Sequence, residues 1–321
     1  MSTPSSTKKL TDAKVLIFDV YGTLADWETG IYNALQPLLS KYPASQSWTR
    51  EEALAAFGSV EIDLQSQYPD MLYSDLLAKV HEVLEERLKA QSTTNPGEGG
   101  AIGATLAGDP AADQEAHRAF GLSIENWAIF PDTCEALQRL SKHFKLVVLS
   151  NVDRTSFRHT HSLLAEGPTR STITSDLSVY TYPEPNPHKY WHPRATPNSK
   201  SPFTLILTAQ DTGCYKPALG GFLTALDYVR SQPELFGDLG LNEAAEEQVK
   251  DKVMSVAQSL VHDHEPASQI GLRSVWIDRQ SAVTCNVTPG GPGAKDKWTW
   301  RFETLGELAD AVEKEIAGEE N

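Results

Sequence analysis

Five short apolar runs, rich in β-branched residues and each ending at a polar position, constrain the fold of this chain most. Runs of this kind are typical of strands that are buried on both faces of a parallel sheet. Helical patterns such as Thr133–His143 and Pro217–Arg230 lie between them, so the sequence predicts a Rossmann-like, doubly wound α/β fold. The predicted strands are Lys14–Asp19, Lys145–Ser150, Phe203–Thr208, Val253–Ser259 and Ser274–Asp278.

A long helical stretch separates the first predicted strand from the second. Its helical patterns exceed what one crossover helix needs, and they cover Ile31–Lys41, Arg50–Gln67 and Leu72–Ala90. We therefore expect residues 29–128 to form an inserted helical cap domain, with residues 1–28 and 129–321 forming the α/β core.

Two segments have the composition of irregular structure. Residues 92–113 are rich in Gly, Ala, Thr and Pro, which predicts a loop inside the cap. Residues 167–202 carry many Pro, Ser and Thr, and they predict an irregular insertion in the core. Aromatic side chains within the second segment favour packing on the surface over a catalytic role.

Charge and cysteine content exclude several classes of protein. Acidic residues outnumber basic ones by 43 to 28, giving a formal charge of −15, which argues against nucleic-acid and anionic-membrane partners. No apolar run reaches the roughly 18 residues of a membrane span, and residues 1–10 lack a signal-peptide core. The 3 cysteines are widely spaced and odd in number, which favours reduced thiols in an intracellular compartment. We expect a soluble cytoplasmic protein with a small-molecule substrate; a homodimer stays open.

The segment that directly follows the first predicted strand carries the strongest chemical signal. Asp19 is followed by Val20, Tyr21, Gly22 and Thr23. An acid at the carboxyl end of a parallel strand, followed by a tight turn, lies in the crevice where such sheets bind ligands. The turn amides can hold an anion beside it. The alternative is an aspartate that caps a helix.

Polar residues also follow the next three predicted strands. Ser150 and Asn151 end the second strand and can bind substrate oxygens, although a simple turn explains them equally well. Lys216 lies just before Pro217, a residue typical of the first position of a helix, where a cation lacks support from the helix dipole and needs a carboxylate nearby. Asp263 could support this lysine, bind a metal or cap a helix.

The first four predicted strands are followed, in chain order, by Asp19, Ser150, Lys216 and Asp263. This ordered set resembles the haloacid dehalogenase superfamily, and the resemblance covers nearly the whole chain. The resemblance implies a HAD-like core in which Asp19 is the nucleophile. Superfamily phosphatases carry a second Asp two residues after the nucleophile, where this chain has Tyr21, a poor acid–base group near neutral pH. A phosphatase, which would use Mg²⁺, is therefore a disfavoured alternative.

Tyr21 instead resembles the metal-independent 2-haloacid dehalogenase branch. That branch has an arginine in the cap, but the matching stretch Ser59–Gln65 contains no Arg or Lys. A narrower resemblance is to the L-azetidine-2-carboxylate hydrolases, whose leaving group is a ring ammonium that needs no such arginine. The matching stretches are Asp26–Gly30, Ile31–Leu38, Asn126–Leu137, Leu149–Arg154, Thr208–Pro217 and Ala257–Ala267.

The resemblance implies a hydrolase with no metal and no cofactor. Asp19 would attack the α-carbon of a small 2-substituted acid to form an aspartyl ester, and Lys216 would pair with Asp19. Asp263 would orient Lys216, and it or one of the histidines His262 and His264 would activate water. The substrate carboxylate would bind Ser150, Asn151 and the amides of Val20 and Tyr21.

The remaining predicted site residues shape the pocket. Tyr21 and Thr23 would lie beside the nucleophile. Trp27, Trp127 and Tyr73 could hold a cationic ring by cation–π contact, with core packing as the alternative for each. The reactions that stay open are ring-opening hydrolysis of L-azetidine-2-carboxylate to 4-amino-2-hydroxybutyrate, hydrolytic dehalogenation of a 2-haloacid, and a phosphatase or a non-catalytic binding protein.

Overall fold

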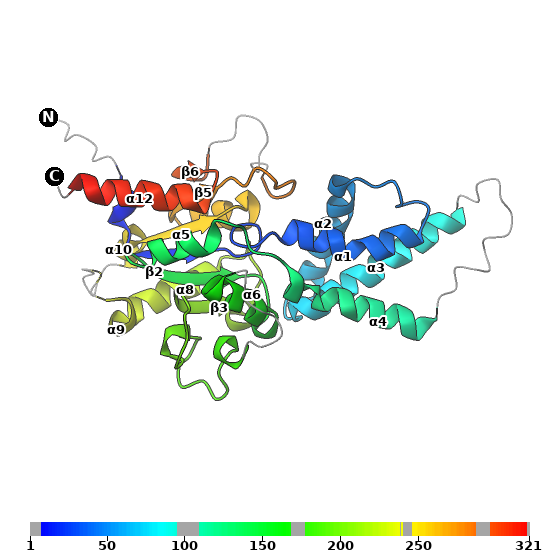
Figure 1. The fold of residues 1–321 in the computed structure, drawn as a ribbon, viewed down its shortest axis with the longest axis horizontal. Helices are drawn as coiled ribbons and strands as arrows, with labels where there is room; N and C mark the ends of the chain where they lie inside the picture. Colours follow the sequence, from blue (N-terminus) through cyan, green and yellow to red (C-terminus); the bar gives the residue numbers. More distant parts are fainter. Residues whose placement is uncertain are drawn as a thin grey trace.

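The fold is built on one parallel sheet of six strands in the order β3-β2-β1-β4-β5-β6 (Figure 1). The strands are β1 (Val15–Phe18), β2 (Lys145–Ser150), β3 (Phe203–Thr208), β4 (Val253–Ala257), β5 (Arg273–Ile277) and β6 (Trp300–Phe302). This order confirms the predicted α/β fold class. The computed structural model describes residues 8–94, 109–167, 177–237, 239, 246–286 and 296–319.

Helices cover both faces of the sheet and form a separate group at one end of the molecule. The α-helices are α1 (Trp27–Lys41), α2 (Arg50–Gln67), α3 (Tyr73–Thr94), α4 (Pro110–Gly121), α5 (Thr133–Leu140), α6 (Arg154–Glu166), α7 (Ala209–Thr212), α8 (Gly220–Ser231), α9 (Pro233–Phe236), α10 (Glu246–Lys252), α11 (Glu265–Gln269) and α12 (Leu305–Glu319). The short helical turns are η1 (Leu10–Asp12), η2 (Leu122–Asn126), η3 (Leu177–Tyr180), η4 (Pro193–Ala195) and η5 (Leu260–His264).

Successive side chains of the strands point to opposite faces, so the sheet has two apolar cores. On one face, Val15 and Ile17 belong to the cluster that packs against α8, α10 and α11. On the other, Leu16 and Phe18 join a larger cluster with residues of α5, α6 and α12. Because all four residues of β1 are buried, this strand lies at the centre of the core and fixes the position of whatever follows it.

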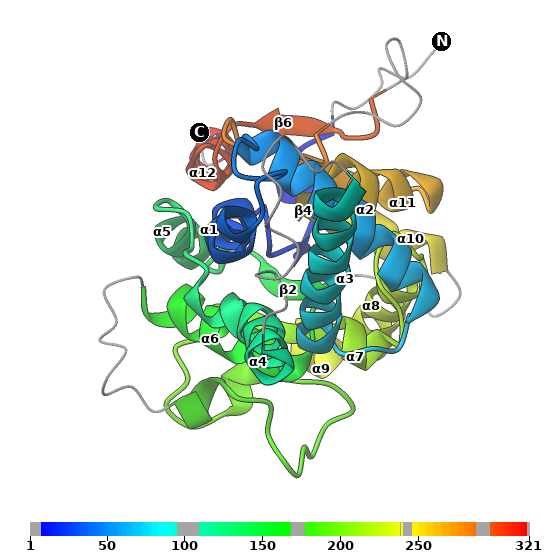
Figure 2. The same cartoon turned by 90° about the vertical axis from the view of Figure 1, so that its right-hand side faces the viewer.

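The helices α1, α2, α3 and α4 lie together beyond the carboxyl ends of the strands, and Figure 2 shows them in front of the sheet. Local signals start them: the Asp26 side chain accepts the Thr29 amide, and Thr49 and Glu52 form a capping box at α2. The boundary expected at residue 28 falls inside the first turn of α1. The limits of a cap domain at 29 and 128 stay a prediction.

Both described ends of the loop expected at 92–113 are helical. Helix α3 continues to Thr94, and α4 begins at Pro110 with the Asp109 side chain accepting the Ala111 amide. Residues 95–108 of the expected loop lie outside the described residues. Helix propensity and a good N-cap therefore override the Gly- and Thr-rich composition at both ends of the segment.

The described part of the insertion, residues 177–202, packs along the outer edge of β3. Trp191 is fully buried, and its carbonyl accepts the amide of Ile206 in β3 at 2.9 Å. The ring of His161 in α6 lies 4.9 Å from the Trp191 ring. Residues 168–176 of the expected insertion lie outside the described residues.

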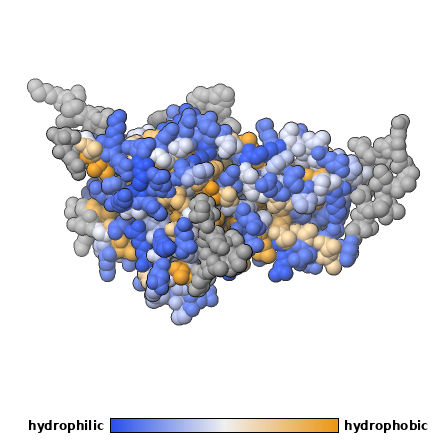
Figure 3. All heavy atoms as spheres, in the orientation of Figure 1, coloured by the Kyte–Doolittle hydropathy of each residue, from blue (hydrophilic) through white to orange (hydrophobic). Residues whose placement is uncertain are grey.

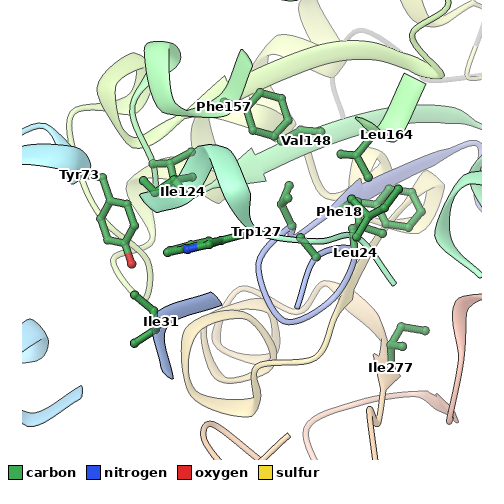
Figure 4. Packing of buried hydrophobic residues seen from close by; sticks show 14 of the residues in the cluster. Phe18, Leu24, Ile31, Tyr73, Ile124, Trp127, Val148, Phe157, Leu164 and Ile277 are labelled. Atoms are coloured by element: carbon green, nitrogen blue, oxygen red, sulfur yellow. The ribbon is translucent and has the colours of Figure 1, made fainter. Parts of the chain in front are cut away.

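The helices α1, α2 and α3 share one apolar interior with the sheet where they meet it. Trp127 lies among buried hydrophobic side chains that include Leu24 and Ile31 (Figure 4). It packs so closely on α1 that a Cβ on Gly30 would approach the Trp127 ring to 2.2 Å, which explains the glycine inside this helix.

The outer surface in Figure 3 is mostly hydrophilic. Among the residues that the structure describes, no helix has the length and apolar content needed to cross a membrane.

Candidate active site

Asp19 occupies the first position after the central strand β1. Its amide donates to the Val256 carbonyl of β4 at 3.1 Å, so the ladder holds its backbone. The chain then turns sharply, with the amides of Thr23, Leu24 and Ala25 all directed to the Val20 carbonyl. Because the sheet order reverses at β1, Asp19 lies at the crevice where parallel sheets bind ligands.

Gly22 is required at this turn for two reasons. Its φ of +99° lies in a region that residues with a side chain rarely adopt. A Cβ there would also come within 3.0 Å of Gln258 Oε1 and 3.1 Å of Trp27 Nε1. The glycine therefore lets the turn close against two residues that line the site.

Lys216 joins two carboxylates from different strands. Its Nζ lies 2.7 Å from Asp19 Oδ1 and 2.8 Å from Asp263 Oδ1, and all three side chains are buried. Burial alone would lower the pKa of Lys216, but the two carboxylates raise it above its ordinary value. The lysine is therefore a fixed cation between Asp19 and Asp263.

Asn151 holds the backbone of Lys216. The Lys216 amide donates to Asn151 Oδ1 at 2.7 Å, and Asn151 Nδ2 donates to the Lys216 carbonyl at 3.0 Å. The expected helix start at Pro217 is wrong, since α8 begins at Gly220. This paired contact, and not a helix end, positions the lysine. The Asn151 amide is thereby occupied at both its oxygen and its nitrogen.

Thr23 holds the Asp19 side chain by a hydrogen bond. Its hydroxyl donates to Asp19 Oδ2 at 2.6 Å and accepts the Gln258 amide at 2.8 Å. The side chain is fully buried. The carbonyl of Thr23 in turn accepts the guanidinium of Arg279, which also pairs with Asp132 at 2.8 Å. These contacts make Thr23 a positioning residue for Asp19.

Asp263 and the two histidines lie on η5, a π-helical turn after β4. Burial raises the pKa of Asp263, and its Oδ2 is buried without a hydrogen-bond partner among the described residues. His264 is fully buried, with Nδ1 at 2.8 Å from Ser274 Oγ and Nε2 at 2.9 Å from the Ala257 carbonyl. Both of its nitrogens are engaged, so His264 is not available as a base. Burial lowers the pKa of His262 to about 4.

The carboxylates and Lys216 open into a cavity of about 380 Å³ between the sheet and α2. The core contributes Asp19, Tyr21, Asn151, Val152, Lys216, Gln258, Ser259, Val261, His262, Asp263, Thr284 and Cys285. The helices α1, α2 and α3 contribute Trp27, Leu54, Ala55, Gly58, Ser59, Glu61, Ile62, Gln65 and Tyr73. The wall is largely apolar apart from these ionisable groups, as is usual for a small-molecule site.

The remaining predicted residues divide between the cavity wall and its surroundings. Trp27 and Tyr21 line the cavity; the Tyr21 hydroxyl lies 2.9 Å from Thr160 Oγ1. Trp127 lies behind Tyr21, in edge contact at 5.2 Å, and is not among the described residues that line the cavity. It packs in the core. Ser150 is also outside the wall, and its buried hydroxyl has no hydrogen-bond partner in the described part of the chain.

Two acidic residues of this region carry roles that sequence patterns did not indicate. Glu28 is buried in the first turn of α1 and accepts the amides of Val283 and Thr284. Its Oε2 also pairs with Arg50 Nη2 of α2 at 3.1 Å. Glu28 therefore connects the loop that carries Thr284 and Cys285 to the first turns of α1 and α2. The second residue, Glu61, lines the cavity from α2.

The donor set at the strand ends does not fit Mg²⁺. A divalent cation prefers several carboxylate and carbonyl oxygens. Here one oxygen each of Asp19 and Asp263 is already bound to the ammonium of Lys216, and the other Asp19 oxygen accepts from Thr23. No cluster of three or more metal-ligating side chains occurs within the described ranges.

Solved structures of the same fold include three informative relatives. The L-2-haloacid dehalogenase PA0810 is 18% identical, with a TM-score of 0.54 over 94% of this chain and 99% of that one. The L-2-haloacid dehalogenase of Xanthobacter autotrophicus with chloropropionic acid covalently bound is 13% identical, with a TM-score of 0.54 over 94% and 98%. A putative HAD-hydrolase, YfnB from Bacillus subtilis, bound to magnesium, is 14% identical, with a TM-score of 0.52 over 94% and 99%. At these identities the likeness shows the fold alone.

The sequence itself matches one family over more than half of its length. A comparison with curated protein sequences found no match. The model of the haloacid dehalogenase-like hydrolases matches residues 13–191, which span β1, the helices α1 to α4 and β2. The chain therefore belongs to the haloacid dehalogenase-like hydrolases.

Proposed function

We propose that this protein hydrolyses small 2-substituted carboxylic acids through an aspartyl ester on Asp19, and that its substrate is L-azetidine-2-carboxylate, opened to 4-amino-2-hydroxybutyrate. The observation that carries the proposal is the charge of the cavity wall. Among its described lining residues, three carboxylates, Asp19, Glu61 and Asp263, accompany a single lysine. Such a wall favours a substrate with a positive nitrogen over one that releases an anion.

The halide of a 2-haloacid would need a cation to receive it. Lys216 is held by two carboxylates at 2.7 and 2.8 Å, and no arginine is among the described residues of the wall. A ring ammonium has no such need, because it leaves as an amine. Ring strain supplies part of the driving force that a halide would otherwise provide.

The reaction has two steps, a displacement at the α-carbon and hydrolysis of the resulting ester. A carboxylate oxygen of Asp19 attacks the α-carbon, the C–N bond breaks, and its electron pair goes to the ring nitrogen, which becomes the amine of the opened chain. Water then attacks the ester carbonyl of Asp19, and cleavage of the acyl C–O bond releases the 2-hydroxy acid and restores the carboxylate. One proton of the water goes to the product hydroxyl, and the other goes to the amine released in the first step. Attack from the side opposite the nitrogen inverts the α-carbon.

Backbone amides of the turn are suited to the substrate carboxylate. The amides of Val20 and Tyr21 have no hydrogen-bond acceptor among the described residues, and they follow the nucleophile directly. Amides in such a turn bind anions through their aligned dipoles. The Asn151 side chain, bound to Lys216 on both sides, contributes by holding that lysine.

The proposed reaction uses no metal and no cofactor, because Lys216 supplies the positive charge that would otherwise come from Mg²⁺. Ring opening that is unchanged by EDTA supports this part of the proposal, and dependence on added Mg²⁺ contradicts it. We also propose a cytoplasmic enzyme without nucleic-acid partners, in line with its charge of −15.

A substrate panel tests the proposal. Purified protein is incubated with L-azetidine-2-carboxylate and, separately, with L-2-chloropropionate, while 4-amino-2-hydroxybutyrate and chloride are measured. We expect ring opening by the natural chain and no detectable ring opening by Asp19→Asn. Ring opening that survives in Asp19→Asn refutes the covalent step. Asp227→Asn makes the same change at an exposed residue outside the cavity wall and is the matched control.

Isotope labelling distinguishes the ester mechanism from direct attack by water. In a single turnover in ¹⁸O water, the label enters Asp19 and the product hydroxyl carries unlabelled oxygen. Mass spectrometry of the product and of the peptide that contains Asp19 measures both. Label in the product of the first turnover contradicts the proposal.

Hydrolytic dehalogenation is the second candidate, because two of the structural relatives are L-2-haloacid dehalogenases and one carries chloropropionic acid covalently bound. Chloride release at a kcat/KM above that for ring opening would favour it.

A further inference from the structure

Glu61 of α2 is an ionisable group of the cavity that the two proposed steps do not use. It lies on the cap side of the wall, whereas Asp19 and Lys216 lie on the core side. Its Oε1 accepts the hydroxyl of Tyr73 from α3 at 2.7 Å and lies 3.4 Å from Gln65 Nε2. Its Oε2 has no hydrogen-bond or ion-pair partner among the described residues.

A half-buried carboxylate without a cation is unfavourable in the free protein. Taking a charge out of water costs free energy unless a counter-charge or hydrogen bonds compensate it, and Tyr73 supplies one strong hydrogen bond. Burial accordingly raises the pKa of Glu61 to about 7. Stability alone therefore does not account for a glutamate here, and a cationic ligand would compensate the missing charge.

We propose that Glu61, oriented by Tyr73, binds the positively charged nitrogen of the substrate and thereby selects cyclic imino acids over uncharged and halogenated acids. The inference rests on the proposed function and names the residue that would set its substrate class. It places the two charged groups of the substrate on opposite walls, with the carboxylate at the turn after β1 and the ammonium at α2.

The surroundings of Glu61 agree with this assignment. Tyr73 and Trp27, which also line the cavity, offer aromatic faces to a small cationic ring. The cavity volume of about 380 Å³ accommodates a four- or five-membered imino acid. The ionisable groups that share the cavity with Glu61 are Tyr73 from α3, Tyr21 and Asp19 after β1, Lys216 after β3, and His262, Asp263 and Cys285.

Glu61 gives the α2 side of the cavity wall a carboxylate. An anion leaving toward α2 would be repelled, whereas an ammonium would be attracted. The charge of this one position therefore distinguishes the two classes of leaving group.

The test compares two unreactive ligands that differ only in charge. L-proline carries the ring ammonium but lacks the ring strain of azetidine, and cyclopentanecarboxylate has the same ring without the nitrogen. Dissociation constants are measured by calorimetry for the natural chain, Glu61→Gln, Tyr73→Phe and the control Glu51→Gln. Glu51 lies on the same helix and is exposed, so its variant makes the same change in charge outside the cavity.

We expect the natural chain to bind L-proline more tightly than cyclopentanecarboxylate. Glu61→Gln should weaken L-proline binding by about tenfold to one hundredfold, because it removes a charged hydrogen-bond acceptor. Binding of cyclopentanecarboxylate should change by less than about twofold, and Glu51→Gln should change neither ligand. Tyr73→Phe keeps the charge and should weaken L-proline binding by about twofold to tenfold. It also provides the test if Glu61→Gln fails to fold.

The outcomes separate this inference from the proposed reaction. If azetidine is not opened but L-proline binding depends on Glu61, the reaction is wrong and the inference stands. If azetidine is opened with the same KM by Glu61→Gln, the reaction stands and the inference is overturned. Equal affinity of the natural chain for both ligands also overturns it.

Discussion

Lys216 is expected to stabilise the fold, and Lys216→Met tests this expectation. Its Nζ lies 2.7 Å from Asp19 and 2.8 Å from Asp263. At an effective dielectric constant of about 20, each contact corresponds to roughly 6 kcal/mol of gross attraction, most of which desolvation offsets. Methionine matches the length of the lysine stem but leaves two buried carboxylates facing each other. We expect a loss of about 3–5 kcal/mol in the free energy of unfolding.

The loss should depend on pH in a defined direction. Without the lysine, burial and the neighbouring Asp19 carboxylate raise the pKa of Asp263 further above the unfolded value of about 3.9. A carboxyl group with a raised pKa binds its proton more tightly in the folded state. Stability is therefore retained at low pH and lost as pH rises through the folded pKa. The deficit of Lys216→Met should be larger at about pH 8 than at about pH 5.

Guanidinium denaturation followed by circular dichroism measures these differences. Lys142→Met, at an exposed position, should change stability by less than about 0.5 kcal/mol. Adding Asp263→Asn to Lys216→Met removes one of the two facing charges and should recover about 1–3 kcal/mol. A deficit equal to that of Lys142→Met, or one that grows on acidification, would refute the reasoning.

Three further expectations follow from groups around the cavity. The KM for L-azetidine-2-carboxylate, measured from initial rates, should fall as pH rises through about 7, because burial raises the pKa of Glu61 to about 7 and the ionised form binds an ammonium. The KM of Glu61→Gln should show no such fall. Gly22→Ala, at φ +99°, should destabilise the chain by about 1–3 kcal/mol and lower kcat, whereas Gly58→Ala in α2, with nothing within 4 Å of its Cβ, should stabilise it by about 0.5–1 kcal/mol in thermal unfolding. Glu28→Gln should lower the free energy of unfolding by about 2–4 kcal/mol, because it weakens the pairing with Arg50 at 3.1 Å and the hydrogen bonds to the loop. A melting temperature equal to that of the natural chain would contradict this role of Glu28.

The strands of the sheet could be predicted because their sequences leave few alternatives. Each of the five predicted runs is buried on both faces, and a run of this composition is stable in a helix-covered parallel sheet. The sixth strand, β6, was missed. It has three residues, of which Trp300 and Phe302 are half-buried and Arg301 is exposed, so no apolar run marks it. Its pairing with β5 depends on tertiary contact, which sequence patterns do not report.

Within the site, the meeting of Asp19, Lys216 and Asp263 was predictable, because parallel strands end at one edge of the sheet. The contacts of Asn151 were not. Its amide binds the backbone of a residue 65 positions later, which leaves no local pattern. The orientation of Glu61 was equally hidden, because its hydrogen-bond partner Tyr73 is supplied by the next helix.

The clamp formed by Glu28 and Arg50 affects how this enzyme could be re-engineered. The wall residues Thr284 and Cys285 follow β5 in the chain, but their loop is anchored to the first turn of α1. A chimera that replaced residues 29–128 by the helices of a relative would keep Glu28 but remove Arg50, which pairs with Glu28 and donates to the Ser281 carbonyl of the same loop. A workable exchange has to keep an arginine at position 50, or to transfer Glu28 and the loop of residues 279–286 together with the helices, because these segments contact one another although they are distant in sequence.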